Sequence, residues 1–98
     1  TSMKIEGQAA LVTGGGSGLG EATARELARL GAKVAVLDVN LEGAQRVASD
    51  IGGIGLKCDV TDTASVQAAI DAAAAAHGPA RILMNIAGIG TAKRVVQK

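Results

Sequence analysis

The stretch TGGGSGLG, residues 13–20, stands between the apolar run AALV (9–12) and the helix-forming run EATARELARL (21–30). A strand, a glycine-rich turn and a helix in this order direct a helix N-terminus and free backbone N–H groups at one point. The helix dipole and these donors both favour negative charge, so the pattern predicts a turn that binds phosphate.

The glycines of this turn each have an expected task. Gly14 permits the sharp turn off the strand, because glycine adopts positive φ angles without steric cost. Gly18 lets the backbone approach a pyrophosphate without an intervening Cβ, and Gly20 lets the helix pack closely on the sheet. We therefore expect this turn to hold the pyrophosphate of a dinucleotide.

Length and composition indicate one small globular domain. The chain has 98 residues, of which 48% are hydrophobic and 19% are charged. This balance is typical of a folded chain rather than a disordered one. We interpret residues 1–98 as a single domain, with Thr1 and Ser2 ahead of Met3 as a cloning remnant.

Charge and hydropathy argue against several classes of partner. The formal net charge is +1, and no stripe of Lys and Arg precedes the tail. Because binding to a nucleic-acid backbone needs clustered positive charge, we expect no nucleic-acid partner. No apolar run approaches the roughly 20 residues that span a membrane, and residues 1–4 lack a signal-peptide core. We expect a cytoplasmic protein with no membrane partner.

Apolar and helix-forming segments alternate along the chain. We expect strands at about 8–13, 33–38, 54–59 and 81–86, separated by helices at about 18–30, 41–51 and 63–77. Continuous apolar runs such as 34–37 are typical of parallel strands buried on both faces. Because strand–helix–strand crossovers are right-handed, the βαβαβαβ pattern predicts an α/β fold, a Rossmann-type doubly wound parallel sheet with strand order 3-2-1-4.

The first and third helices have readable features. Gly31 is expected to end the first helix, and Thr61 or Asp62 is expected to cap the start of the third. The predicted core face of the first helix consists of residues at helical spacing: Ala24, Leu27 and Leu30.

Asp38 ends the second expected strand, about 20 residues past the turn. A carboxylate there can accept hydrogen bonds from both hydroxyls of an adenosine ribose and would repel a 2′-phosphate. No Lys or Arg occurs in the turn or at 39–41 to receive such a phosphate. The sequence therefore favours NAD over NADP. The alternative is that Asp38 caps a turn or the next helix.

The third and fourth expected strands also end in polar or glycine-containing stretches. Asp59 lies at the edge of the sheet where ligands bind in such folds, and it can accept a hydrogen bond from an adenine amino group or cap the next helix. The fourth strand ends in Asn85-Ile86-Ala87-Gly88. Gly88 permits close approach of the backbone to a cofactor, and Asn85 can tie neighbouring strands together.

These four places resemble the short-chain dehydrogenase/reductase family. Its marks are TGxxxGxG after the first strand, an acidic residue ending the second in NAD-dependent members, Asp-Val ending the third and NNAG ending the fourth. Ile86 stands where the family usually has a second Asn. The resemblance implies NAD as cofactor and the following cofactor-binding residues: Gly14, Ser17, Gly18, Leu19, Gly20, Asp38, Asp59, Val60, Ile86, Ala87 and Gly88.

The resemblance also implies an activity, the oxidation of a secondary alcohol to a ketone. The turn and residues 85–93 look like the type II 3-hydroxyacyl-CoA dehydrogenase branch, which implies a 3-hydroxyacyl-CoA or a related alcohol as the small-molecule substrate. It further implies a homo-oligomer, a tetramer, for the complete protein. Family members use a Ser, a Tyr and a Lys that lie beyond the fourth strand. Because the chain contains no Tyr, we expect a truncated domain with no catalytic residue.

Two other functions stay open at this point. A self-standing module could bind a dinucleotide without catalysis, and a methyltransferase also pairs a glycine-rich turn with an acid ending the second strand. The stretch NIAG at 85–88 points away from a methyltransferase, and a P-loop is excluded because Glu21 rather than Lys follows Gly20. With Cys58 and His77 as the single residues of their types, we expect no metal site.

Overall fold

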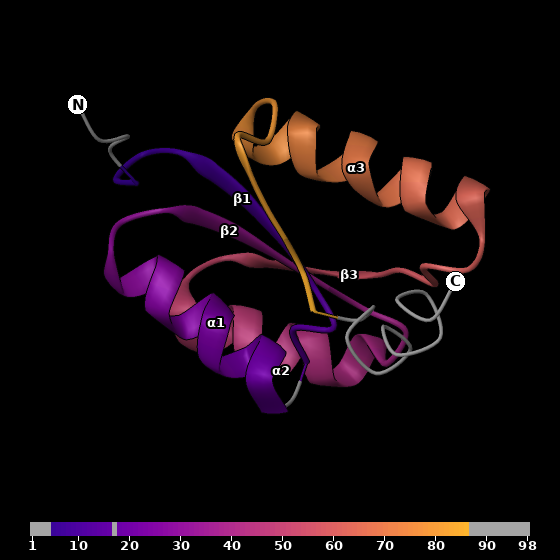
Figure 1. Cartoon of the computed structure of the whole chain (residues 1–98), viewed down its shortest axis with the longest axis horizontal. Coiled ribbons are helices and arrows are strands. Elements are labelled where there is room, and N and C mark those ends of the chain that lie inside the picture. The colour runs from indigo at the N-terminus through magenta and orange to yellow at the C-terminus, as the bar shows by residue number, and fades with distance from the viewer. Residues whose placement is uncertain (1–4, 17, 87–98) are drawn as a thin grey trace, which may run out of the picture.

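The fold is a four-stranded parallel sheet with helices on both faces (Figure 1). The computed structural model describes residues 5–16 and 18–86. The elements follow in the order β1 (Ala9–Thr13), α1 (Gly18–Arg29), β2 (Lys33–Asp38), α2 (Leu41–Ile51), β3 (Ile54–Lys57), α3 (Thr63–His77) and β4 (Ile82–Asn85). The strand order is β3-β2-β1-β4, and every pair is parallel. The predicted doubly wound fold and strand order are confirmed.

The two central strands divide their side chains between two cores. Helices α1 and α2 cover one face of the sheet and α3 covers the other (Figure 1). Val12, Val34 and Val36 pack with α1 and α2, whereas Leu11 and Leu37 pack with α3. Because successive side chains of a strand point to opposite faces, a continuous apolar run serves both cores.

The end of α1 differs from the prediction at one core position. Ala24 and Leu27 are buried as expected, but Leu30 lies beyond the helix end at Arg29 and is 38% exposed. The chain reverses at Gly31, whose φ of 95° lies in the left-handed region. The prediction of Leu30 as a core residue is therefore wrong, because the turn carries it away from the buried face.

Side-chain hydrogen bonds set the boundary between β3 and α3. The strand ends at Lys57 rather than at 59, and the Asp59 N–H donates to Ser65 Oγ (2.9 Å). Helix α3 starts with Asp62 as its N-cap, whose carboxylate accepts from the N–H groups of Ala64 and Ser65. Of the two residues expected to cap this helix, Asp62 is therefore confirmed.

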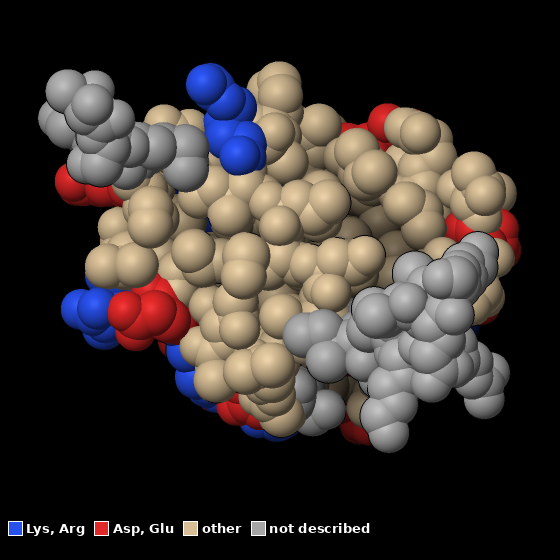
Figure 2. All heavy atoms as spheres, in the orientation of Figure 1, with Lys and Arg blue, Asp and Glu red and all other residues tan. Residues whose placement is uncertain are grey.

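Strand β4 forms an edge of the sheet with its side chains largely exposed. It pairs only with β1 among the described strands, and Leu83 and Met84 are 62% and 36% exposed. In Figure 2, uncharged residues form the middle of the face on which β4 lies. An edge strand with apolar side chains and unpaired backbone groups is a template for association with another chain.

The 98-residue chain, purified alone, should self-associate through β4. Leu83→Lys should shift the population toward monomer, because a charge on an edge strand opposes edge-to-edge pairing. Analytical ultracentrifugation over a concentration series measures the self-association of the wild-type chain and of the Leu83→Lys variant. A wild-type chain that sediments as a monomer at every concentration would contradict the prediction.

Candidate functional site

The carboxyl ends of β1, β2 and β3 enclose a pocket of about 220 Å³. Parallel strands end at the same edge of a sheet, so residues far apart in the sequence meet there. The pocket is lined by Gly14, Asp38, Val39, Cys58, Asp59 and Val60. The structure thus brings together four residues that the sequence predicted for the site: Gly14, Asp38, Asp59 and Val60.

The turn after β1 uses its glycines for conformation and for close contact. Gly14 has a φ of 72°, and its N–H donates to the Leu37 carbonyl oxygen (2.7 Å), which keeps the turn on the end of β2. A Cβ on Gly20 would lie 1.8 Å from the Gly14 carbonyl oxygen. Gly20 is therefore required for the close contact between α1 and the turn that follows β1.

Gly18 occupies a different environment from Gly20. Its φ is 58°, and a Cβ added to it would meet no atom of the described residues within 4 Å. The backbone at the start of α1 is thus open on this side. This accessibility is what close approach of a phosphate to the helix N-terminus requires.

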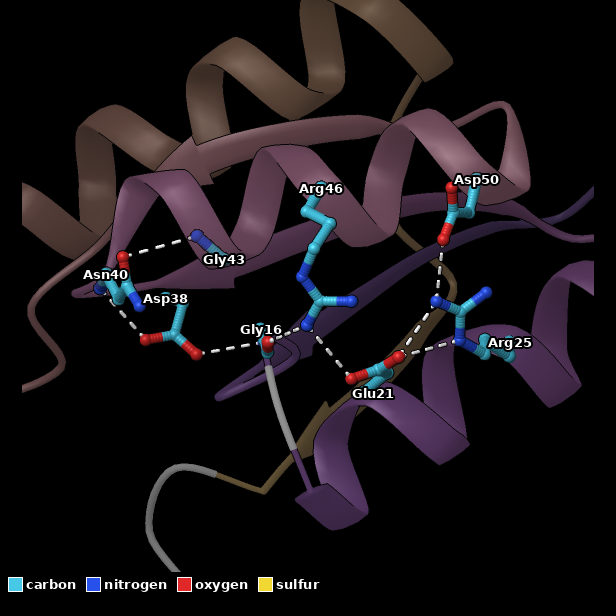
Figure 3. Close-up of polar contacts among 8 residues, drawn as sticks. All are labelled: Gly16, Glu21, Arg25, Asp38, Asn40, Gly43, Arg46 and Asp50. Atoms are coloured by element: carbon cyan, nitrogen blue, oxygen red, sulfur yellow. Dashed lines mark hydrogen bonds and ion pairs between the residues drawn. The ribbon is translucent and has the colours of Figure 1, made fainter.

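Asp38 holds the turn through its carboxylate (Figure 3). The Gly16 N–H donates to Oδ2 and the Asn40 N–H donates to Oδ1, both at 2.9 Å. The N-cap of α2 is Asn40, whose side chain accepts from the Gly43 N–H. Asp38 therefore bridges two loops and does not cap α2. Each carboxylate oxygen has a further lone-pair site with which to accept a hydroxyl group.

Arg46 lies beside the glycine-rich turn and was missed by the sequence reasoning. Its Nη2 donates to the Gly16 carbonyl oxygen (3.1 Å) and to Glu21 Oε1 (3.2 Å) (Figure 3). The signal that could have found it is its spacing from Gly43, since residues three apart lie on one face of a helix. A small residue on that face lets α2 approach the turn, and an arginine one turn later can reach it.

Asp59 is exposed at the edge of the pocket and bonds to the loop that follows it. Its Oδ1 accepts from the Thr61 hydroxyl (2.6 Å) and from the Thr61 N–H (2.9 Å). These hydrogen bonds, chiefly the one from the hydroxyl, hold the pKa of the Asp59 carboxyl below its usual value. The carboxylate is therefore ionised and acts as an acceptor, while Asp62 takes the capping role.

A second, apolar pocket of about 210 Å³ adjoins the first, and both are lined by Cys58 and Val60. It lies between the sheet and α3, with Val66, Ile70 and Leu83 among its lining residues. At its rim the Thr13 hydroxyl donates to Asn85 Oδ1 (2.7 Å), which joins β1 to β4. The prediction that Asn85 ties neighbouring strands together is confirmed.

The remaining predicted site residues are spread more widely. Leu19 is 60% exposed at the start of α1. Ile86 packs against the hydrophobic core on the side of α1 and α2. Ser17, Ala87 and Gly88 lie outside the described residues.

Two negative findings apply to residues 5–16 and 18–86. No helix in these ranges is long and apolar enough to cross a membrane. Nor do they contain a group of three or more His, Cys, Asp or Glu side chains that could hold a metal ion.

Comparison with known proteins places the chain in a family. A family model described as short chain dehydrogenase matches residues 8–98. D-threitol dehydrogenase of Mycolicibacterium smegmatis is 48% identical over 92 residues, which cover 89% of this chain and 35% of the relative. The mitochondrial borneol dehydrogenase of Lavandula x intermedia is 40% identical over 91 residues, covering 93% of this chain and 35% of the relative.

A solved structure shares both the fold and the sequence pattern. The 3-ketoacyl-(acyl-carrier-protein) reductase of Brucella melitensis, crystallised with NADH, superposes with a TM-score of 0.79 at 43% identity. The match covers 81% of this chain and 34% of the reductase. The chain belongs to the short-chain dehydrogenase family, and it spans about a third of the length of these relatives.

Substitution of the two glycines of α1 should affect stability unequally. Gly20→Ala should lower the free energy of unfolding by about 3 kcal/mol or more, because its Cβ would overlap the Gly14 carbonyl oxygen. Gly18→Ala should cost only about 1–2 kcal/mol, the strain of a left-handed backbone. Urea unfolding followed by circular dichroism measures the free energy of unfolding of each variant. An equal decrease in the two variants would refute the prediction.

Proposed function

We propose that the carboxyl edge of the sheet binds NAD and that the protein oxidises a secondary alcohol to a ketone. The observation that carries the proposal is the pocket in which the glycine-rich turn, Asp38 and Asp59 meet. Bound NAD would supply the acceptor for the hydride that leaves the alcohol carbon, and the hydroxyl proton would be released separately. The family membership and the NADH in the Brucella melitensis reductase support this assignment.

The described residues fit the parts of a dinucleotide. The open backbone at Gly18 and the N-terminus of α1 suit the pyrophosphate. The remaining lone pairs of the Asp38 carboxylate suit the hydroxyls of the adenosine ribose. Asp59 and Val60, at the other side of the pocket, suit the adenine. These residues bind and orient the cofactor, and none of them is assigned a proton-transfer role.

The substrate class that we propose is a small secondary alcohol. The relatives are named for threitol, a polyol, and for borneol, a bicyclic alcohol. The 3-hydroxyacyl-CoA substrate expected from residues 85–93 is a narrower proposal, and those residues lie largely outside the described part. A panel of a polyol, a terpene alcohol and a 3-hydroxyacyl-CoA, assayed for NADH formation with the protein as its gene encodes it, discriminates among them.

Asp38→Ala should narrow the preference for NAD over NADP by about tenfold, since it removes both the ribose hydrogen bonds and the repulsion of a 2′-phosphate. Titration of both cofactors against the wild type and the variant measures the change. Asp71→Ala is the matched control, because Asp71 is an exposed aspartate of α3 that bonds to Gln67. A wild type that prefers NADP would refute the assignment.

Gly18→Val should abolish detectable NAD binding while the sheet stays folded, because a branched side chain would fill the space left open for the phosphates. Isothermal titration with NAD, paired with far-UV circular dichroism, separates lost binding from lost folding. Unchanged affinity in a folded variant would show that phosphate does not approach the chain at Gly18.

A further inference from the structure

The two backbone polar groups of Gly16 are held by side chains from two elements outside the turn. Its N–H donates to the carboxylate of Asp38 at the end of β2 (2.9 Å), and its carbonyl oxygen accepts from the guanidinium of Arg46 on α2 (3.1 Å). Figure 3 shows Gly16 between these two side chains. The position of the Gly16 backbone therefore depends on one anion and one cation that lie 22 and 30 residues away along the chain.

The turn also packs tightly on the first turn of α2. A Cβ on Gly16 would lie 3.1 Å from the Ala44 nitrogen, and a Cβ on Gly43 would lie 3.1 Å from the Gly16 carbonyl oxygen. Both contacts are closer than a side chain ordinarily permits. The two glycines thus let α2 approach the turn closely enough for Arg46 to reach the carbonyl.

A chain of ion pairs holds Arg46 in place (Figure 3). Glu21 on α1 accepts from Arg46 through one carboxylate oxygen and pairs with Arg25 through the other (2.8 Å). Arg25 pairs in turn with Asp50 on α2 (2.8 Å). The two arginines also hold the pKa of the Glu21 carboxyl below its usual value, so the anchor stays charged. The network links α1, α2 and the turn.

We propose that Arg46 is a positioning residue for the dinucleotide phosphates, acting through the Gly16 carbonyl. A carbonyl oxygen carries partial negative charge and repels a phosphate that it faces. Arg46 keeps this oxygen bonded to α2, so it is not an unpaired acceptor beside the N–H groups at the start of α1. The inference rests on the proposed NAD binding and adds to it a residue outside the glycine motif.

An alternative role for Arg46 would be direct reception of a 2′-phosphate. The geometry favours positioning, because the guanidinium is already shared between the Gly16 carbonyl and Glu21. The Asp38 carboxylate bonds to the N–H of the same residue, Gly16, and would repel a phosphate brought close to Arg46. Positioning of the turn and reception of a phosphate predict different responses to NADH and NADPH.

Arg46→Ala should raise the dissociation constant for NADH by about three- to thirty-fold, because the Gly16 carbonyl loses its charged donor. Its affinity for adenosine, which lacks phosphates, should change by less than about twofold. NADH fluorescence measures the first value, and displacement of NADH by adenosine measures the second, both in the protein as its gene encodes it. Arg46→Lys, which retains a cation of similar reach, should recover part of the loss.

Arg29→Ala is the matched control, because Arg29 is an exposed arginine of α1 that pairs with Glu26 and lies outside the network. It should leave NADH affinity unchanged. Unchanged NADH affinity in Arg46→Ala, or an equal loss for adenosine, would overturn the inference. A larger loss for NADPH than for NADH would assign Arg46 to a 2′-phosphate instead. A wild type that binds no NADH would overturn the proposed function itself, and the inference with it.

Discussion

The contact between Gly20 and the carbonyl of Gly14 is the constraint on which the rest of the site depends. A Cβ at position 20 would lie 1.8 Å from that carbonyl oxygen, so the backbone of α1 touches the backbone of the turn. Helix α1 can then begin at Gly18, directly after the turn, with Ala24 and Leu27 packed on the sheet. At Gly18, the start of α1, an added Cβ would meet no atom of the described residues within 4 Å.

The polar groups of the turn depend on residues outside it. The Gly16 N–H donates to Asp38 and its carbonyl oxygen accepts from Arg46, so both backbone polar groups of this residue bond to side chains. In the proposed function, Asp38 also binds the ribose, which makes its carboxylate common to the cofactor and to the turn. Because Asp38 and Arg46 bond to the same residue, the free-energy effects of substituting them are not expected to be additive.

Local sequence pattern was sufficient for the order and type of every described element. Alternating apolar strands and helix-forming segments, with glycines at the joints, predicted the strand order β3-β2-β1-β4. The predictions were wrong at the ends of elements, where single hydrogen bonds decide which residue is the last of a helix or strand. Leu30 continues the apolar periodicity of α1, yet the turn at Gly31 carries it outward. The strand β3 ends at Lys57 rather than at 59, and the Asp59 N–H donates to the Ser65 side chain instead of to a strand. Neither effect has a periodic signature.

The sequence by itself determined the glycine-rich turn, the acidic residues ending β2 and following β3, and the edge at which they gather, because these follow from strand polarity and residue type. Only the tertiary structure decided what those residues touch. In the folded domain Gly20 packs against Gly14, and the Asp38 carboxylate accepts from the Gly16 N–H. Arg46, 30 residues further along the chain, donates to the Gly16 carbonyl oxygen. Such contacts depend on how closely two helices approach one loop, and that distance arises from packing of the whole domain rather than from any local pattern.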